Sequence, residues 1–116
     1  MPFDVVECDH YLELRLAGPL DEDGWASRSG LLSNNADRKR FLLNFSDATA
    51  VSVPTNQLVR SAERIKGRDW RIAILAPRPE FFGLARQTIQ LAALPEGESV
   101  NVFRSRAAAV QWLLAD

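Results

Sequence analysis

The sequence predicts an α/β domain with a mixed, mainly parallel sheet of about five strands and four helices, in the order β-β-α-β-α-β-α-β-α. Three observations point to this fold class. An early segment alternates apolar and polar residues with period two, as strands do. Three later apolar runs are short and nearly continuous, which is typical of strands buried on both faces. Segments with helical apolar spacing separate these runs, and such alternation favours right-handed parallel crossovers.

Length and composition restrict the function classes. The chain has 116 residues, which suits a single domain over 1–116. Its formal net charge of -1 gives no strong field for nucleic acid, so no nucleic-acid partner is expected. Cys8 is the only cysteine, which excludes an intrachain disulfide and a thiolate metal cluster. No secretory signal or bilayer-length apolar run is visible, so we expect a cytoplasmic protein without stable membrane insertion.

The N-terminal region predicts an antiparallel hairpin of two extended segments, 3–8 and 11–17, joined at Asp9-His10. Gly18-Pro19 is expected to break the second strand. The second segment places leucines on one face and charged residues on the other: Leu12, Leu14 and Leu16 against Glu13 and Arg15.

The next elements are a helix and a buried strand. The acidic run at 21–23 suits the first turn of a helix, where it opposes the positive dipole end, and this helix is expected to reach about Asn35. The apolar run Arg40–Phe45 predicts a central strand. A loop is expected from Ser46 to Val53.

Proline, glycine and serine mark the boundaries of the later elements. Proline is favoured at the first helical position, glycine just after the last, and serine at the N-cap. The predicted elements are a helix from Pro54 to about Gly67, a strand over 70–76, a helix from Pro79 to a turn at 95–97, a strand over 99–103 and a final helix after Ser105.

Four segments carry a family resemblance: Arg71–Ala76, Phe82–Arg86, Val100–Arg104, and Ala109 with Trp112-Leu113. Together with the element order, they resemble the STAS superfamily, in its SpoIIAA-like branch of anti-sigma-factor antagonists and small bacterial proteins. The resemblance covers nearly the whole chain. It implies a regulatory domain that binds a protein partner.

In anti-sigma-factor antagonists, an apolar strand leads into an Asp-Ser-Ser/Thr-Gly loop in which a serine is phosphorylated by a partner kinase. Aligning Leu42–Phe45 with that strand puts Ser52 on the aspartate, Val53 on the phosphoacceptor and Thr55 on the glycine. The acceptor position therefore has no hydroxyl, and the resemblance implies a domain without the usual phosphoryl switch. Ser52 or Thr55 replaces the acceptor only if the alignment shifts.

The sequence contains few of the residues and motifs that catalytic or metal-binding sites require. His10 is the single histidine and lies in the predicted hairpin turn, so we expect a surface histidine rather than a general base. The acidic run at 21–23 places neighbouring side chains in different directions on a helix, which favours capping over a metal site. No glycine-rich phosphate loop occurs. We expect no enzyme activity, no cofactor and no metal.

The candidate binding residues follow from position. Ligands of open α/β sheets gather at the carboxyl ends of parallel strands, beside helix N-termini. The alternative is that side chains there only cap helices and form turns, and a structural role is also open for Gly83 and for Arg86, which is expected to stack on Phe82. The binding candidates are Ser52, Thr55, Asn56, Arg78 and Arg86, with Ser46, Asp47, Arg104 and Ser105 at the same predicted edge.

Two functions remain open at this point. The first is a non-enzymatic regulatory or protein-binding module with an unidentified protein partner. The alternative is a carrier of a small apolar, lipid-like ligand, because the resembling branch is often grouped with lipid-binding SEC14 domains. A homodimer through an edge strand or through Phe81-Phe82 is also open.

Overall fold

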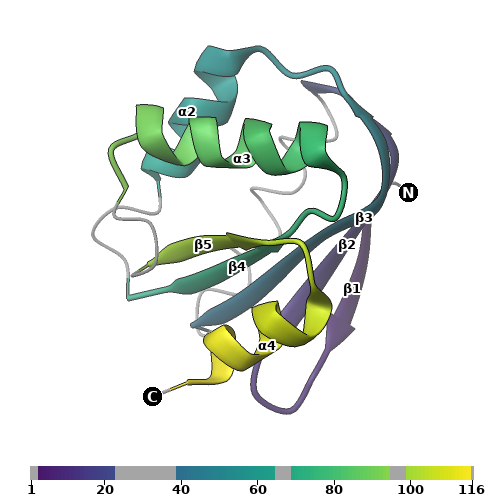
Figure 1. Cartoon of the computed structure of the whole chain (residues 1–116), viewed down its shortest axis with the longest axis vertical. Helices are drawn as coiled ribbons and strands as arrows, with labels where there is room; N and C mark the ends of the chain where they lie inside the picture. Colours follow the sequence, from purple (N-terminus) through teal and green to yellow (C-terminus); the bar gives the residue numbers. More distant parts are fainter. Residues whose placement is uncertain (1–2, 23–38, 65–68, 95–98, 116) are drawn as a thin grey trace.

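A computed structural model describes residues 3–22, 39–64, 69–94 and 99–115 (Figure 1). They form a five-stranded mixed sheet in the order β1-β2-β3-β4-β5. β1 runs antiparallel to β2, and the other neighbouring strands are parallel. The strands are β1 (Phe3–Glu7), β2 (Leu12–Leu20), β3 (Arg40–Val51), β4 (Arg71–Leu75) and β5 (Val100–Phe103).

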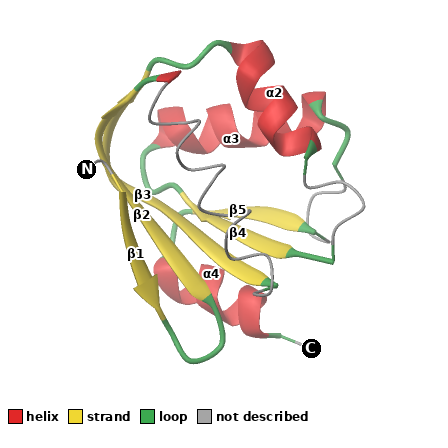
Figure 2. Cartoon of the chain, turned by 180° about the vertical axis from the view of Figure 1, so that it is seen from behind, coloured by secondary structure: helices red, strands yellow, loops and turns green. Residues whose placement is uncertain are grey.

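The described helices cover both faces of the sheet. α2 (Thr55–Glu63) and α3 (Pro79–Leu91) lie on one face, and α4 (Arg106–Leu114) lies on the other (Figures 1 and 2). The helix expected from Asp21 to Asn35 falls mainly on 23–38, outside the described residues. The α/β class and the mixed five-stranded sheet are confirmed, with three helices in the described part of the chain. None of these helices combines the length and apolar composition needed to cross a bilayer.

The sheet divides the hydrophobic core into two layers. The larger layer, under α2 and α3, includes Leu14, Leu43 and Ile72. The smaller layer, under α4, consists of Leu42, Ala73, Leu75, Ala109 and Leu113. β3 and β4 therefore contribute side chains to both layers, as their continuous apolar runs predict.

The N-terminal hairpin forms as predicted, with the Cys8 N–H donating to the Tyr11 carbonyl at 3.0 Å. The expected break at Gly18-Pro19 is wrong, because β2 continues to Leu20. Gly18 adopts φ 70°, which an L side chain rarely tolerates, and the pairing with β3 shifts register here. These irregularities accommodate the proline within a strand.

β3 is longer than predicted, because residues 46–51 continue the strand instead of forming a loop. Its pairing with β4 ends at Asn44 opposite Leu75, whereas its pairing with β2 continues to Val51 opposite Leu20. The two strands thus extend beyond the rest of the sheet, and β3 leads into α2 (Figure 1).

Both helices on the larger core end earlier than the sequence suggests. α2 ends at Glu63, before Gly67, which lies outside the described residues. α3 ends at Leu91, and Ala93 takes the left-handed conformation with φ 57°. The N–H groups of Ala93 and Leu94 donate to the carbonyls of Gln90 and Ile89, at 3.1 Å each. This is a Schellman motif, with alanine at the position that usually holds glycine.

Candidate functional site

Three of the predicted binding residues lie together at the junction between β3 and α2. Ser52 is exposed, and its N–H donates to the Leu20 carbonyl at 2.7 Å. Pro54 is the N-cap of α2 and gives it no side-chain hydrogen bond. Thr55 and Asn56 follow in the first turn with exposed side chains. The junction therefore presents two hydroxyls and one amide to solvent.

The other two predicted residues belong to α3. Arg78 is the exposed N-cap residue, and its Cζ lies 5.9 Å from the centroid of the Phe81 ring. Arg86 lies two turns along the helix, with its Cζ 5.9 Å from the centroid of Phe82, which confirms the expected stacking. Phe81 is buried and Phe82 is half-buried, and both rings belong to or pack against the larger core.

The remaining strand-end residues have local roles. The Ser105 hydroxyl caps α4 by accepting from the Ala108 N–H at 3.4 Å. Arg104 is exposed, with its Nε 3.4 Å from the Pro77 carbonyl oxygen. Ser46 and Asp47 lie within β3, exposed, rather than in a loop.

The extension of β3 places Ser52 well beyond the part of the strand that pairs with β4. Pairing with β4 ends at Asn44, and Ser52 lies eight residues further along the chain. Ser52, Thr55 and Asn56 therefore lie at the β3–α2 junction, whereas Arg78 follows β4 as the N-cap residue of α3.

A buried ionic cluster, which the sequence pattern did not predict, lies on the α4 side of the sheet. The Glu13 side chain is 0% exposed, although the alternating pattern placed it on the polar face of β2. Both its oxygens accept from Arg106, with Nη1 3.0 Å from Oε2 and Nη2 2.5 Å from Oε1. Oε2 also accepts from Arg15 Nε at 2.9 Å and from Asn44 Nδ2 at 3.1 Å.

The cluster sets the charge state of its members. Burial favours the neutral carboxylic acid, but the hydrogen bonds from Arg106, Asn44 and Arg15 outweigh it and lower the pKa of Glu13 to about 2. The hydrogen bond to Glu13 in turn raises the pKa of Arg106. Burial raises the pKa of the neighbouring Tyr11 phenol. A carboxylate held by two guanidinium groups at such a low pKa is a poor general base, so its role is to fasten α4 to β2 and β3.

One signal for this cluster was present in the sequence. Asn44 interrupts the apolar run of β3, and a buried amide requires a hydrogen-bond partner. Asn44 pairs with Arg15 in the register of β2 and β3, two residue pairs from Glu13 and on the same face of the sheet. Arg106, in contrast, lies 93 residues from Glu13 along the chain, so local patterning gives no sign of it.

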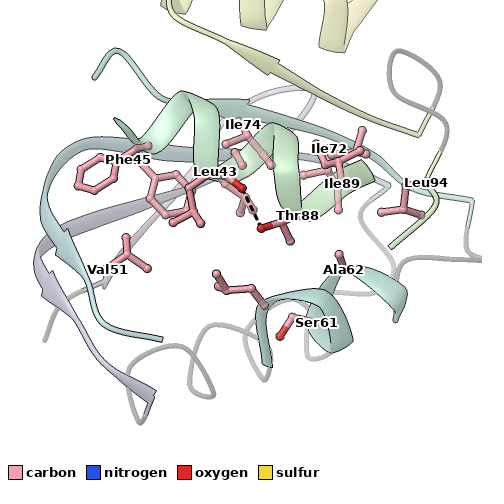
Figure 3. Close-up of a pocket in the computed structure, with 15 residues that line it drawn as sticks. Leu43, Phe45, Val51, Ser61, Ala62, Ile72, Ile74, Thr88, Ile89 and Leu94 are labelled. Carbon is pink, nitrogen blue, oxygen red and sulfur yellow. Dashed lines mark hydrogen bonds between the residues drawn. The ribbon is translucent and has the colours of Figure 1, made fainter. Parts of the chain in front are cut away.

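An apolar cavity of about 80 Å³ lies between α2, α3 and the sheet (Figure 3). Its walls include Leu43 and Ile72 from the strands, Ser61 and Ala62 from α2, and Ala85 and Thr88 from α3.

The sequence expectations for the histidine and for metal ligands can be compared with the described residues. His10 is exposed in the hairpin turn, as expected. No group of three or more histidine, cysteine, aspartate or glutamate side chains is placed to hold a metal within the ranges the structure describes.

Comparison with solved structures identifies the fold. An uncharacterized DUF3478-family protein from Shewanella loihica PV-4, described as having a SpoIIAA-like fold, matches with TM-score 0.61 and 14% identity, over 96% of this chain and 91% of that one. The chain has a SpoIIAA-like fold. Phosphorylated SpoIIAA, a Bacillus cell fate determinant, matches with TM-score 0.61 and 16% identity, over 94% of this chain and 96% of SpoIIAA.

The unphosphorylated form of SpoIIAA, described as an anti-sigma factor antagonist, matches with TM-score 0.56 and 15% identity, over 93% of both chains. No family model and no curated protein matches the sequence. The SpoIIAA-like fold therefore rests on three-dimensional similarity, and it agrees with the resemblance seen in the sequence.

Proposed function

We propose that this chain is a non-enzymatic regulatory module that binds a protein partner through two patches. The first is the β3–α2 junction, with Ser52, Thr55 and Asn56. The second is the exposed side of α3, with Arg78 and Arg86. The observation that carries the proposal is the SpoIIAA-like fold along almost the whole chain, shared with a protein described as an anti-sigma factor antagonist.

The exposure of both patches supports this assignment. All five side chains are exposed. Cation–π contacts with Phe81 and Phe82 restrict the orientation of the two guanidinium groups. An arginine whose orientation is already restricted loses less entropy when it binds a carboxylate, so an acidic partner surface suits this side of α3.

We further propose that partner binding is not controlled by a phosphoryl group at the usual position. SpoIIAA occurs in phosphorylated and unphosphorylated forms. Val53 occupies the aligned acceptor position, lacks a hydroxyl and is buried in the larger core. Mass spectrometry after incubation with kinases from the source cells tests this point. Stoichiometric phosphate on Ser52 or Thr55 would overturn it.

The cavity under α2 is too small to support the alternative function, a carrier of a lipid-like ligand. Sites for ligands of drug or lipid size enclose roughly 300–1,000 Å³. The cavity under α2 has about 80 Å³. A protein-binding role therefore fits the described structure better than transport of a lipid-like ligand.

Affinity capture from the source cells with cross-linking tests the partner surface. Wild-type chain should retain one specific protein, and the double variant N56A/R78A should lose it while keeping its circular dichroism spectrum and melting temperature. Gln111→Ala, an exposed amide on α4, is the matched control. Equal capture by wild type and double variant contradicts the chosen surface. Light scattering of the purified chain shows whether the partner is a second copy.

A further inference from the structure

Small side chains face one another where α2 and α3 approach. Ser61 and Ala62 line the cavity from α2, and Ala85 and Thr88 line it from α3 (Figure 3). Larger residues of the strands, including Leu43, Phe45 and Ile72, form the opposite wall. Leu58 of α2 and Phe81, Leu84 and Ile89 of α3 complete the lining on the helix side.

The lining offers little to a water molecule. The Thr88 hydroxyl already donates to the Leu84 carbonyl at 2.8 Å. Ser61 is buried and has an interaction of its own. A buried water needs about two to four polar partners, and cavities without them stay dry and accept apolar ligands. The chemistry of the walls therefore selects an apolar occupant.

We infer that this cavity is a binding site for a small apolar group, either a free molecule or the end of a short alkyl chain. Its volume of about 80 Å³ limits the size of the occupant. A cavity of roughly 150 Å³ accepts benzene or xenon, so a single xenon atom or a few methylene groups suit this one. The occupant contacts α2 and α3 together and restores the packing that Ser61, Ala62 and Ala85 leave incomplete.

Methyl NMR with two probes tests the site and distinguishes the sources of the apolar group. Xenon represents a free apolar ligand, and octanoate represents the end of an acyl chain. Saturable shifts are expected for the methyl groups of Leu43, Ile72 and Val100, which line the cavity. The methyl groups of Leu42, Leu75 and Leu113, in the core under α4, serve as internal controls and should not shift. If only xenon causes the shifts, the site binds a small free molecule. If octanoate causes them, the site accepts the end of an alkyl chain.

Ala85→Leu fills the cavity from α3 and should abolish the saturable shifts with both probes. Ala107→Leu, at an exposed position of α4, is the matched control and should leave them unchanged. If Ala85→Leu does not fold, Ala62→Leu fills the same space from α2. Absent shifts in the wild type, or equal shifts in the filled variant, overturn the inference. Partner capture is measured separately, so failure of the proposed function leaves this test intact.

Discussion

Arg106, in the first turn of α4, donates from both terminal nitrogens to the buried carboxylate of Glu13 near the start of β2. The contact joins the last helix to a strand near the start of the chain. Arg106 is 46% exposed and Glu13 is 0% exposed, so the bond spans the boundary between solvent and core. α4 is thus held by an ionic contact at its first turn and by Ala109 and Leu113 further along.

Replacing Arg106 with methionine should lower the free energy of unfolding by about 2–4 kcal/mol, because it leaves a buried carboxylate with fewer partners. Arg15 and Asn44 remain as donors and limit the loss. Urea denaturation measures the change. Arg104→Met, an exposed arginine two residues earlier, is the matched control and should alter stability by less than about 1 kcal/mol. Equal effects of the two substitutions would show that Arg106 does not hold α4 through Glu13.

The pH dependence of stability should report Glu13. The carboxyl pKa is lowered from 4.5 to about 2 in the folded chain, so the folded state binds a proton here less readily than the unfolded state. This contribution is complete above about pH 5 and is lost as pH falls toward about 2. At roughly 1.4 kcal/mol per pKa unit it amounts to about 3 kcal/mol.

Glu13→Gln removes the titrating group and should flatten the stability profile between about pH 5 and pH 2 relative to wild type. Urea midpoints measured across this range give the comparison. The other carboxyl groups contribute to both proteins equally, so the difference isolates Glu13. Parallel profiles for the two proteins would refute the assignment.

Local patterns predicted most of the sheet because its strands have simple signatures. The runs at Phe41–Phe45 and Ile72–Leu75 are apolar on both faces, and both faces are covered. The extension of β3 through 46–51 was not predictable in the same way. Apolar and polar side chains alternate only weakly in this segment. It is held in the strand by pairing with β2, which is distant along the chain.

The candidate site was predicted less well for a physical reason. Exposed residues such as Thr55 and Asn56 are recognisable from their position in the first turn of a helix, but where that turn lies relative to Arg78 depends on how far β3 extends. Glu13 looked like a solvent-facing residue because alternation in β2 identifies two faces without showing what covers each. The cover is α4, at the opposite end of the sequence.

Ala93→Gly should raise the free energy of unfolding by about 0.5–1 kcal/mol. Ala93 has φ 57° at the end of α3, a conformation that glycine adopts without a steric penalty from Cβ. Its side chain is exposed, so no packing is lost. The same substitution at exposed Ala108 in α4 should lower stability by up to about 1 kcal/mol, since the backbone there is helical. Thermal unfolding followed by circular dichroism compares the two variants, and a loss of stability in Ala93→Gly would contradict the argument.

Gly83→Ala should stabilise the chain by up to about 1 kcal/mol, because Gly83 lies inside α3 and alanine is the better helix former. A Cβ at this position meets no heavy atom within 4 Å, so close packing does not explain the glycine. Gly18 offers the same open space but has φ 70°, and Gly18→Ala should therefore destabilise the chain by about 1 kcal/mol. Urea denaturation of both variants separates backbone strain from steric room. If Gly83→Ala gains stability yet captures less partner than wild type, the glycine serves recognition at the exposed side of α3; if it loses stability, the helix-propensity argument is wrong.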